Sequence, residues 1–138
     1  MLTEDQKKIY SKMADVLIPS AEGMPSASEA DVPTKWIDDA LRYRPDLEPS
    51  LLRALVFGAK YDAKESVEAL NAEDVEAFDA LGVLTSGAYF LNPTVKKLIG
   101  YPGQIPSPAN DDVDLYIEML TKVVERGPIY RPTVEVRK

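Results

Sequence analysis

The sequence contains no cysteine and no histidine among its 138 residues. Without thiols it can form no disulfide, no Cys-ligated zinc or iron–sulfur centre and no cysteine nucleophile. Without imidazole it can provide neither a His-ligated haem nor a Ser-His-Asp triad. Carboxylates are the only acid–base side chains present in quantity, so the chain has few groups suited to catalysis of its own.

Basic residues are also outnumbered by acidic ones. Sixteen Lys and Arg residues stand against twenty-three Asp and Glu, which gives a net charge of −7. Because phosphate backbones are bound by basic surfaces, this composition predicts that nucleic acid is not a partner. No apolar run approaches the ~20 residues that cross a bilayer, so we expect no membrane span.

The N-terminal residues carry no recognisable export signal. Residues 1–8 resemble a capped helix and contain neither an apolar signal-peptide core nor a twin arginine. As it reads, the sequence predicts a cytoplasmic protein; a periplasmic location would require that a twin-arginine signal had been removed. The absence of cysteine is compatible with every redox compartment and therefore does not indicate the location of the protein.

Nucleotide-binding and metal-binding motifs are missing as well. There is no G-x-x-x-x-G-K-[ST] and no G-x-G-x-x-G run. The acidic residues 110–114 fail as a calcium loop, because the sixth position is Leu115 where Gly is needed and the twelfth is Thr121 where Glu is needed. The acidic residues of this segment are explained by the start of a helix, where negative side chains interact favourably with the helix dipole. We therefore expect no metal and no cofactor in this chain.

What the sequence does contain is helical periodicity. A capping box formed by Thr3 and Gln6 predicts a helix over residues 4–18. Further helices are predicted between Pro33 and Pro45 and from Pro49 onward. Residues 61–69 have a weaker pattern and are predicted to form a loop or a frayed turn.

The second half of the sequence predicts three more helices. Asn71 is the expected N-cap of a long helix, with Leu70 packing onto Val75 across the cap. Gly82 and Gly87 within that helix indicate that something packs closely against it. A short helix begins at the Asn-Pro pair 92–93 and ends at residue 100, where Gly can adopt a left-handed conformation.

The last predicted helix has the clearest amphipathic pattern, and the Gly-Pro pair 127–128 ends it. Residues 129–138 lack a helical period and are predicted to be extended. The expected fold is mainly α: an irregular bundle of five or six helices with Pro/Gly-rich loops and an extended C-terminal tail. By length, residues 1–138 are expected to form a single domain.

Aromatic side chains near Pro and Gly are the candidate binding residues. Two of them are consecutive on a helix, about 100° apart, so both cannot face one narrow core stripe. Another precedes a Pro-Gly turn that would hold it rigidly at the surface. Each ring could equally fold back onto the core, as we expect for Trp36, but together they favour an interaction surface. The predicted partner-binding residues are Tyr89, Phe90, Tyr101, Pro102, Gly103, Gln104, Tyr130 and Arg131.

Residues 87–104, GAYFLNPTVKKLIGYPGQ, resemble the gluconate 2-dehydrogenase subunit 3 family. Members of that family carry an Ala-Tyr-Tyr-like pair, then Pro-x-Val, then Gly-Tyr-Pro-Gly. Residues 14–19 and 30–33, on either side of a small-residue loop, are similar to the opening of that family. The resemblance thus covers most of the chain, and its sharpest motif is the Gly-Tyr-Pro-Gly-Gln run at 100–104.

The resemblance implies a non-catalytic small subunit that binds and stabilises a large FAD-dependent sugar or polyol oxidoreductase of the glucose-methanol-choline type, sometimes with a cytochrome c subunit. FAD would belong to the partner, and no catalytic, cofactor-binding or metal-binding residue is carried over to this chain. Many members have a twin-arginine signal and escort their partner out of the cell; here the stabilising role is the expected one. Two alternatives stay open: a stand-alone helical enzyme that uses carboxylates on a sugar, and a homo-oligomeric scaffold.

Overall fold

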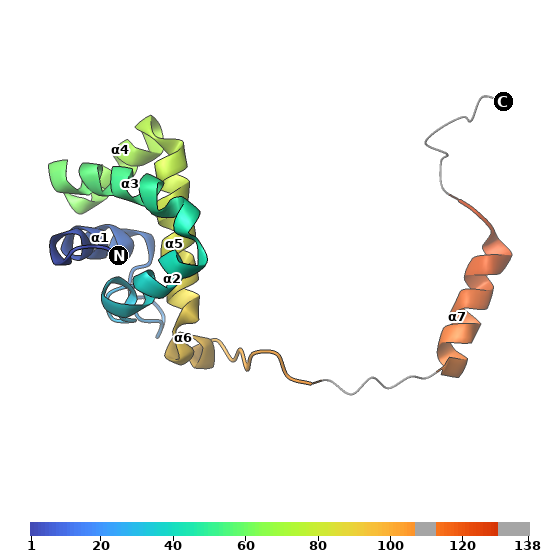
Figure 1. The fold of residues 1–138 in the computed structure, drawn as a ribbon. Helices are drawn as coiled ribbons and strands as arrows, with labels where there is room; N and C mark the ends of the chain where they lie inside the picture. The colour runs from blue at the N-terminus through green and yellow to red at the C-terminus, as the bar shows by residue number, and fades with distance from the viewer. Residues whose placement is uncertain (107–112, 130–138) are drawn as a thin grey trace, which may run out of the picture. The chain divides into compact units, whose positions relative to one another are not determined.

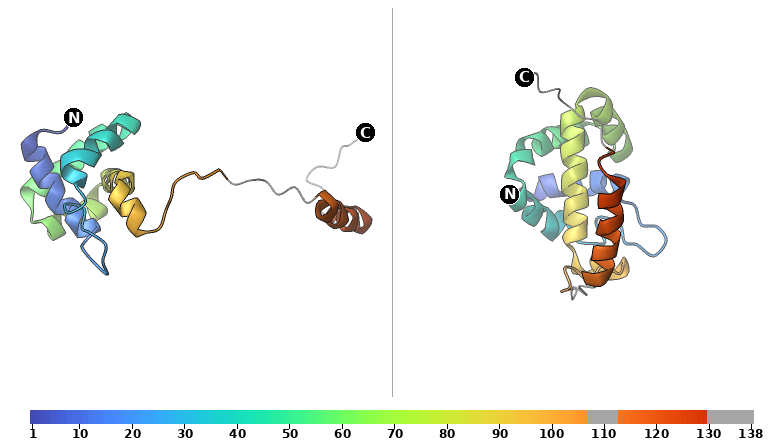
Figure 2. Two further views of the ribbon diagram at one scale, coloured as in Figure 1. Left: turned by 90° about the horizontal axis from the view of Figure 1, so that it is seen from below. Right: turned by 90° about the vertical axis from the view of Figure 1, so that its right-hand side faces the viewer.

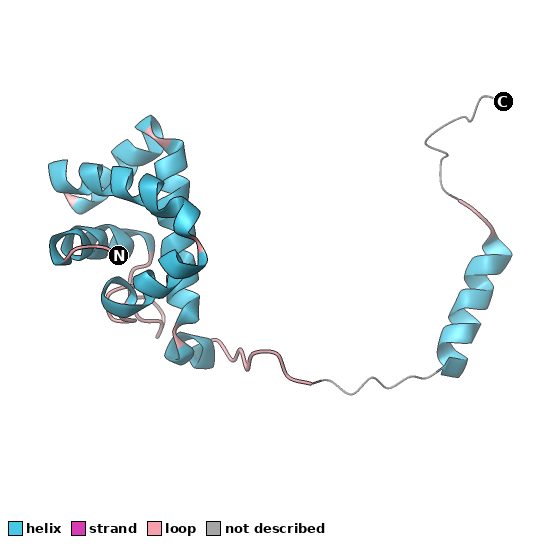
Figure 3. Ribbon diagram, in the orientation of Figure 1, coloured by secondary structure: helices cyan, strands magenta, loops and turns pink. Residues whose placement is uncertain are grey.

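The computed structural model describes residues 1–106 and 113–129, and all regular structure in these ranges is helical (Figure 1, Figure 3). The predicted all-α irregular bundle is therefore confirmed, with seven α-helices in the described ranges where five or six were expected. The chain divides into two compact units, Met1–Gly103 and Gln104–Lys138. Each unit is described by itself, and the single domain over residues 1–138 stays a prediction.

The first unit contains six α-helices: α1 (Glu4–Leu17), α2 (Ile37–Tyr43), α3 (Glu48–Lys60), α4 (Ala63–Glu73), α5 (Val75–Leu91) and α6 (Pro93–Leu98). A π-helical turn, Val32–Trp36, leads into α2, and a 3₁₀ turn, Pro45–Leu47, precedes α3. Helix α5 contacts each of the other five helices. Figure 2 shows it running the length of this unit.

The start of α1 confirms the predicted capping box. The Gln6 N–H donates to Thr3 Oγ1 at 3.3 Å, and the Thr3 N–H donates to Gln6 Oε1 at 2.8 Å. Two N–H groups that would otherwise lack an intrahelical partner are satisfied in this way. The helix ends at Leu17, one residue before the predicted end, because Pro19 disfavours the helical conformation at Ile18.

The segment predicted as a loop or frayed turn is instead largely helix α4. Asp62 is its N-cap and accepts a 2.9 Å hydrogen bond from the Glu65 N–H. One face of α4, which includes Val67 and Leu70, is buried against the core. The apolar pattern was weak because the third buried position of this face is a serine, Ser66, whose hydroxyl donates to the Ala63 carbonyl at 2.9 Å.

The predicted start of α5 was also wrong. Asn71 lies in the last turn of α4, and the true N-cap of α5 is Asp74, which accepts a 3.0 Å hydrogen bond from the Ala77 N–H. The expected packing of Leu70 on Val75 does not occur, since Leu70 is fully buried and Val75 is exposed. Asp74 ends one helix and begins the next, so the two helices meet without a loop.

All six helices of the first unit, and the loop after α1, contribute residues to its core. Its largest fully buried side chains are Tyr10, Met13, Ile37, Leu51, Leu70, Leu81 and Leu84. The Tyr10 and Thr85 hydroxyls are hydrogen-bonded at 3.0 Å within this core, and burial raises the pKa of the Tyr10 phenol. Trp36, expected in the core, lies at its edge, partly buried, with the Lys35 ammonium 4.3 Å from its ring centroid.

The glycines predicted to allow close packing are not in close contact. A Cβ added at Gly82 or Gly87 would have no neighbour within 4 Å. The close approach occurs at Gly58 of α3, where an added Cβ would lie 2.5 Å from Met13 Sδ and 2.6 Å from Ile9 Cγ2. The small residue is needed where α3 crosses α1, which no local pattern in the sequence indicates.

The second unit contains helix α7, Val113–Arg126, which ends before the Gly-Pro pair as the sequence predicts. Gly127 follows it with φ +69°, as expected for a helix end. No other described residue of this unit covers its apolar side, formed by Val113, Tyr116, Ile117, Leu120, Val123 and Val124. The predicted extended tail lies outside the described residues, apart from its first residue. In the described ranges, no helix is both long and apolar enough to cross a bilayer.

Candidate functional site at the end of α6

Helix α6 carries the sharpest sequence motif at its C-terminal end, and a buried asparagine fixes where it begins. Asn92 Oδ1 accepts a hydrogen bond from the Thr94 N–H at 2.8 Å, which confirms the predicted N-cap. Its Nδ2 donates to the Ala30 carbonyl at 2.8 Å in the interior. Pro93 occupies the first helical position, where its missing N–H leaves no partner unsatisfied. Asn92 therefore joins α6 to the loop that follows α1.

The end of α6 is a Schellman motif. Gly100 has φ +70°, the Tyr101 N–H donates to the Lys96 carbonyl at 2.8 Å, and the Gly100 N–H donates to the Lys97 carbonyl at 3.1 Å. These two bonds fix the backbone of Tyr101 relative to the helix. Gly103 has φ +86°, the positive value predicted for the turn after Pro102.

A shallow groove of about 560 Å³ lies over this helix end. We call its lining the α6 platform: Pro93, Lys96, Lys97, Gly100, Tyr101, Pro102 and Gly103. Tyr101 is 53% exposed there, as the sequence predicted. The apolar spacing of Val95, Leu98 and Ile99 predicts that all three point inward. Leu98 and Ile99 are instead about half exposed, because a helix of six residues on α5 buries only one side, which Val95 occupies.

The structure brings only part of the predicted binding set together. Tyr101, Pro102 and Gly103 line the platform, and the exposed Gln104 begins the second unit. Phe90 is 49% exposed on α5 and does not line the platform. Tyr130 and Arg131 lie outside the described residues.

Tyr89, which the sequence placed in the binding surface, belongs to the core. Only 4% of it is exposed, and its hydroxyl donates a 2.7 Å hydrogen bond to the Pro25 carbonyl. Partial burial, together with the Glu29 carboxylate, raises the pKa of the phenol. Its ring meets that of Phe90 edge to face at 5.5 Å, so one ring of the pair faces inward and the other outward. Tyr89 is therefore removed from the candidate binding residues.

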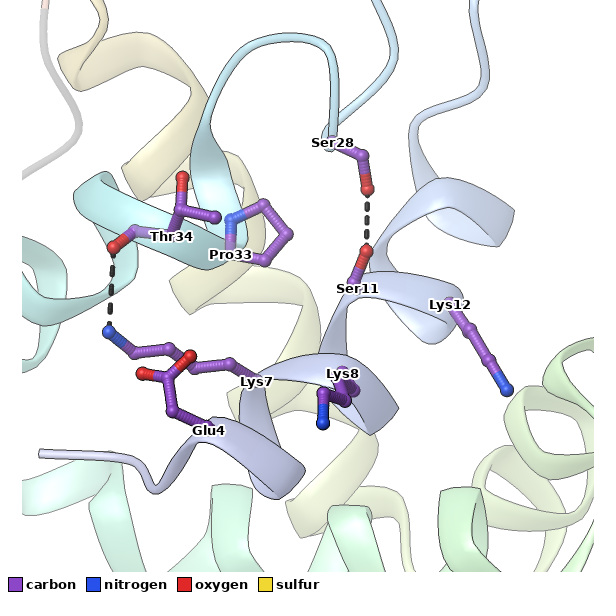
Figure 4. Close-up of a pocket in the computed structure, with 8 residues that line it drawn as sticks. All are labelled: Glu4, Lys7, Lys8, Ser11, Lys12, Ser28, Pro33 and Thr34. Atoms are coloured by element: carbon purple, nitrogen blue, oxygen red, sulfur yellow. Dashed lines mark hydrogen bonds between the residues drawn. The ribbon is translucent and has the colours of Figure 1, made fainter.

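A second pocket, of about 460 Å³, lies between α1 and the loop that follows it, and sequence reasoning missed it (Figure 4). The available signal was the helical spacing of Lys8 with Lys12 and of Lys7 with Ser11, which puts these residues on one side of α1. The Ser11 and Ser28 hydroxyls are hydrogen-bonded at 2.7 Å in this pocket.

The charges of this second pocket are largely paired within the chain. Lys7 Nζ lies 2.7 Å from Asp38 Oδ2 and donates to the Thr34 carbonyl at 3.4 Å, and Lys8 Nζ lies 3.1 Å from Asp5 Oδ1. Figure 4 shows the Lys8 and Lys12 ammonium groups pointing away from the two serines rather than converging on a common point. These contacts hold the loop against α1, and we do not choose this pocket as the functional site.

Within residues 1–106 and 113–129, no three Asp or Glu side chains are grouped so that they could hold a metal ion. Compared with family models, curated proteins and solved structures, the chain matches none. The family expected from the sequence therefore stays an expectation, and four residues of its sharpest motif, 100–103, line the α6 platform.

Proposed function

We propose that the chain is a non-catalytic accessory subunit that binds, through the α6 platform, a large FAD-dependent sugar or polyol oxidoreductase of the glucose-methanol-choline type and stabilises it. The observation that carries the proposal is Tyr101, half exposed on a backbone that the Schellman bonds hold rigid. A preorganised aromatic side chain loses little conformational entropy on binding, and such residues are frequent anchors of protein interfaces.

The choice of partner is supported by the motif order in residues 87–104. In such an assembly the flavin of the large subunit carries out the redox chemistry, and a cytochrome c subunit would accept electrons in a three-subunit form. The small subunit would act by covering apolar surface of the large one. A partner that binds the folded state and not the unfolded state stabilises a protein by mass action. The large subunit would therefore be obtained in higher yield, and with more bound flavin, when the small subunit is present.

The test is co-expression of the chain with the flavoprotein, followed by measurement of the affinity of the purified pair by calorimetry. Tyr101→Ala is expected to weaken the complex by about 2 kcal/mol, which is roughly a 30-fold rise in Kd. The matched control is Tyr43→Ala, since Tyr43 is 71% exposed on α2, away from the platform. The control should bind like the wild type.

Two outcomes contradict the proposal. One is a flavoprotein that reaches full yield, flavin content and activity when expressed alone. The other is an unchanged Kd for Tyr101→Ala in a chain whose circular dichroism is that of the wild type. If Tyr101→Ala unfolds the chain, Tyr101→Leu keeps apolar bulk at this position and should still weaken the complex.

A further inference from the structure

We infer that the partner surface bound by the α6 platform is acidic, and that Lys96 and Lys97 recognise it by charge. This inference rests on the proposed function, because the partner is the flavoprotein proposed above. It adds the chemistry of the surface that meets the platform.

Lys96 and Lys97 differ from most cations of the first unit. Six of the other Lys and Arg side chains lie within 4.0 Å of a carboxylate: Lys7, Lys8, Arg42, Arg44, Arg53 and Lys64. Lys35 and Lys60 lie over aromatic rings. Lys96 and Lys97 form no ion pair and no side-chain hydrogen bond with any described residue, although the whole chain carries a net charge of −7. Among the described residues, no acid pairs with these two adjacent ammonium groups; Lys12, on α1, is likewise unpaired but stands alone.

The ammonium groups of Lys96 and Lys97 are not needed to satisfy the carbonyl groups at the end of α6, because backbone N–H groups already do so. Lysines in the last turn of a helix commonly stabilise its free carbonyls and the negative end of its dipole. Here the carbonyls of residues 96 and 97 accept the N–H groups of Tyr101 and Gly100. The six residues of α6 also give a small dipole. The lysine side chains are therefore available to an external anion.

The surroundings of the lysines favour a protein surface over a free anion. Tyr101 lines the same groove as the two lysines and exposes about half of its surface there. A partner that places carboxylates next to an apolar patch would satisfy both features at once. Nucleic acid is disfavoured, because a chain of net charge −7 repels a polyanionic backbone, and self-association through the lysines is an outcome of the test below.

Exposed charges at the rim of an interface act mainly on the rate of association. The test therefore measures the association rate constant between the chain and the flavoprotein subunit that co-purifies with it, identified by its flavin absorbance. The double variant Lys96→Glu/Lys97→Glu is expected to associate roughly tenfold more slowly at low salt. This difference in rate should largely disappear near 0.5 M salt. At that concentration the Debye length is on the order of a few ångströms, so the exposed charges are screened.

The matched control is Lys12→Glu/Lys64→Glu, which changes the net charge by the same amount. Both of its lysines are exposed, on α1 and α4. The control should slow association far less than the platform variant. The association rate constant of Lys96→Gln/Lys97→Gln should lie between those of the wild type and of Lys96→Glu/Lys97→Glu. Thermal melts that match the wild type establish that each variant is folded.

Four results would overturn the inference, and they are distinguishable from one another. Equal slowing by platform and control variants would mean that only net charge matters. A complex that forms at wild-type rate with the platform variant would reject the acidic surface and leave the proposed function standing. If no flavoprotein binds the chain, or if salt-sensitive self-association in light scattering disappears with Lys96→Glu/Lys97→Glu, both proposals fail.

Discussion

The Tyr89 hydroxyl donates a 2.7 Å hydrogen bond to the carbonyl oxygen of Pro25, 64 residues earlier in the chain. Asn92, close to Tyr89 in sequence, donates to the Ala30 carbonyl at 2.8 Å. The junction of α5 and α6 therefore holds the loop after α1 at two points. The same junction begins the helix that carries the platform, so loop and platform share one support.

Replacing Tyr89 by Phe is expected to destabilise the chain by about 1 kcal/mol, because the Pro25 carbonyl loses its donor while the ring keeps its packing. Urea denaturation followed by circular dichroism measures the change in the free energy of unfolding. Tyr43→Phe is the control, since Tyr43 is 71% exposed. Equal stability of both variants would show that the Tyr89 hydroxyl contributes nothing to folding.

Local signals in the sequence predicted several elements correctly. The capping box at Thr3, the N-cap at Asn92 and the left-handed Gly100 are each recognisable from a few neighbouring residues. The presence and the end of α7 follow from its apolar period and from the Gly-Pro pair that ends it. Exposure of Tyr101 follows from the same local reasoning, since the Schellman end and Pro102 together fix its backbone.

Features that depend on distant residues were missed. Tyr89 is buried because the carbonyl of Pro25 lies within its reach, and nothing near Tyr89 in the sequence indicates that partner. Asn71 and Asp74 are both good N-cap residues, and tertiary packing of Leu70 in α4 decides between them. That no described acid pairs with Lys96 also requires the folded structure, because sequence alone does not show which carboxylates come close.

Gly58→Ala is expected to destabilise the chain by about 1 kcal/mol or more, whereas Gly82→Ala is expected to stabilise it by about 0.5–1 kcal/mol. Both glycines are helical, so both substitutions favour helix formation. The two substitutions differ in the room available for the new Cβ. At residue 58 it would clash with the buried Met13, and at residue 82 it has no neighbour within 4 Å. Urea midpoints measure both, and the same sign for both would contradict the close approach of α1 and α3.

Gly100→Ala is expected to destabilise the chain by about 1 kcal/mol, although there is open space for the new Cβ, because alanine is strained at φ +70°. Gly100→Asn should cost less, since asparagine tolerates this conformation better. Both costs can be measured by thermal unfolding. An alanine variant as stable as the asparagine one would show that the left-handed helix end is not maintained in solution.

The ion pair between Arg53 and Asp74 predicts how stability depends on pH. Arg53 Nε donates to Asp74 Oδ2 at 2.9 Å, and this bond, with that from the Ala77 N–H, holds the pKa of Asp74 below its ordinary value. A carboxyl whose pKa is lower in the folded than in the unfolded state stabilises folding above the unfolded value. That contribution is lost as the pH falls through the folded value.

Asp74→Asn is therefore expected to melt at a lower temperature than the wild type near pH 7, and the gap should narrow as the pH is lowered below the ordinary aspartate value of about 3.9. Asparagine is as good an N-cap as aspartate, so the substitution removes the charge and keeps the α5 cap. Asp79→Asn is the control on the same helix, because Asp79 is exposed and forms no ion pair among the described residues. Thermal unfolding at several pH values measures both variants. A gap between wild type and Asp74→Asn that stays constant with pH would show that the charge of Asp74 does not stabilise the fold.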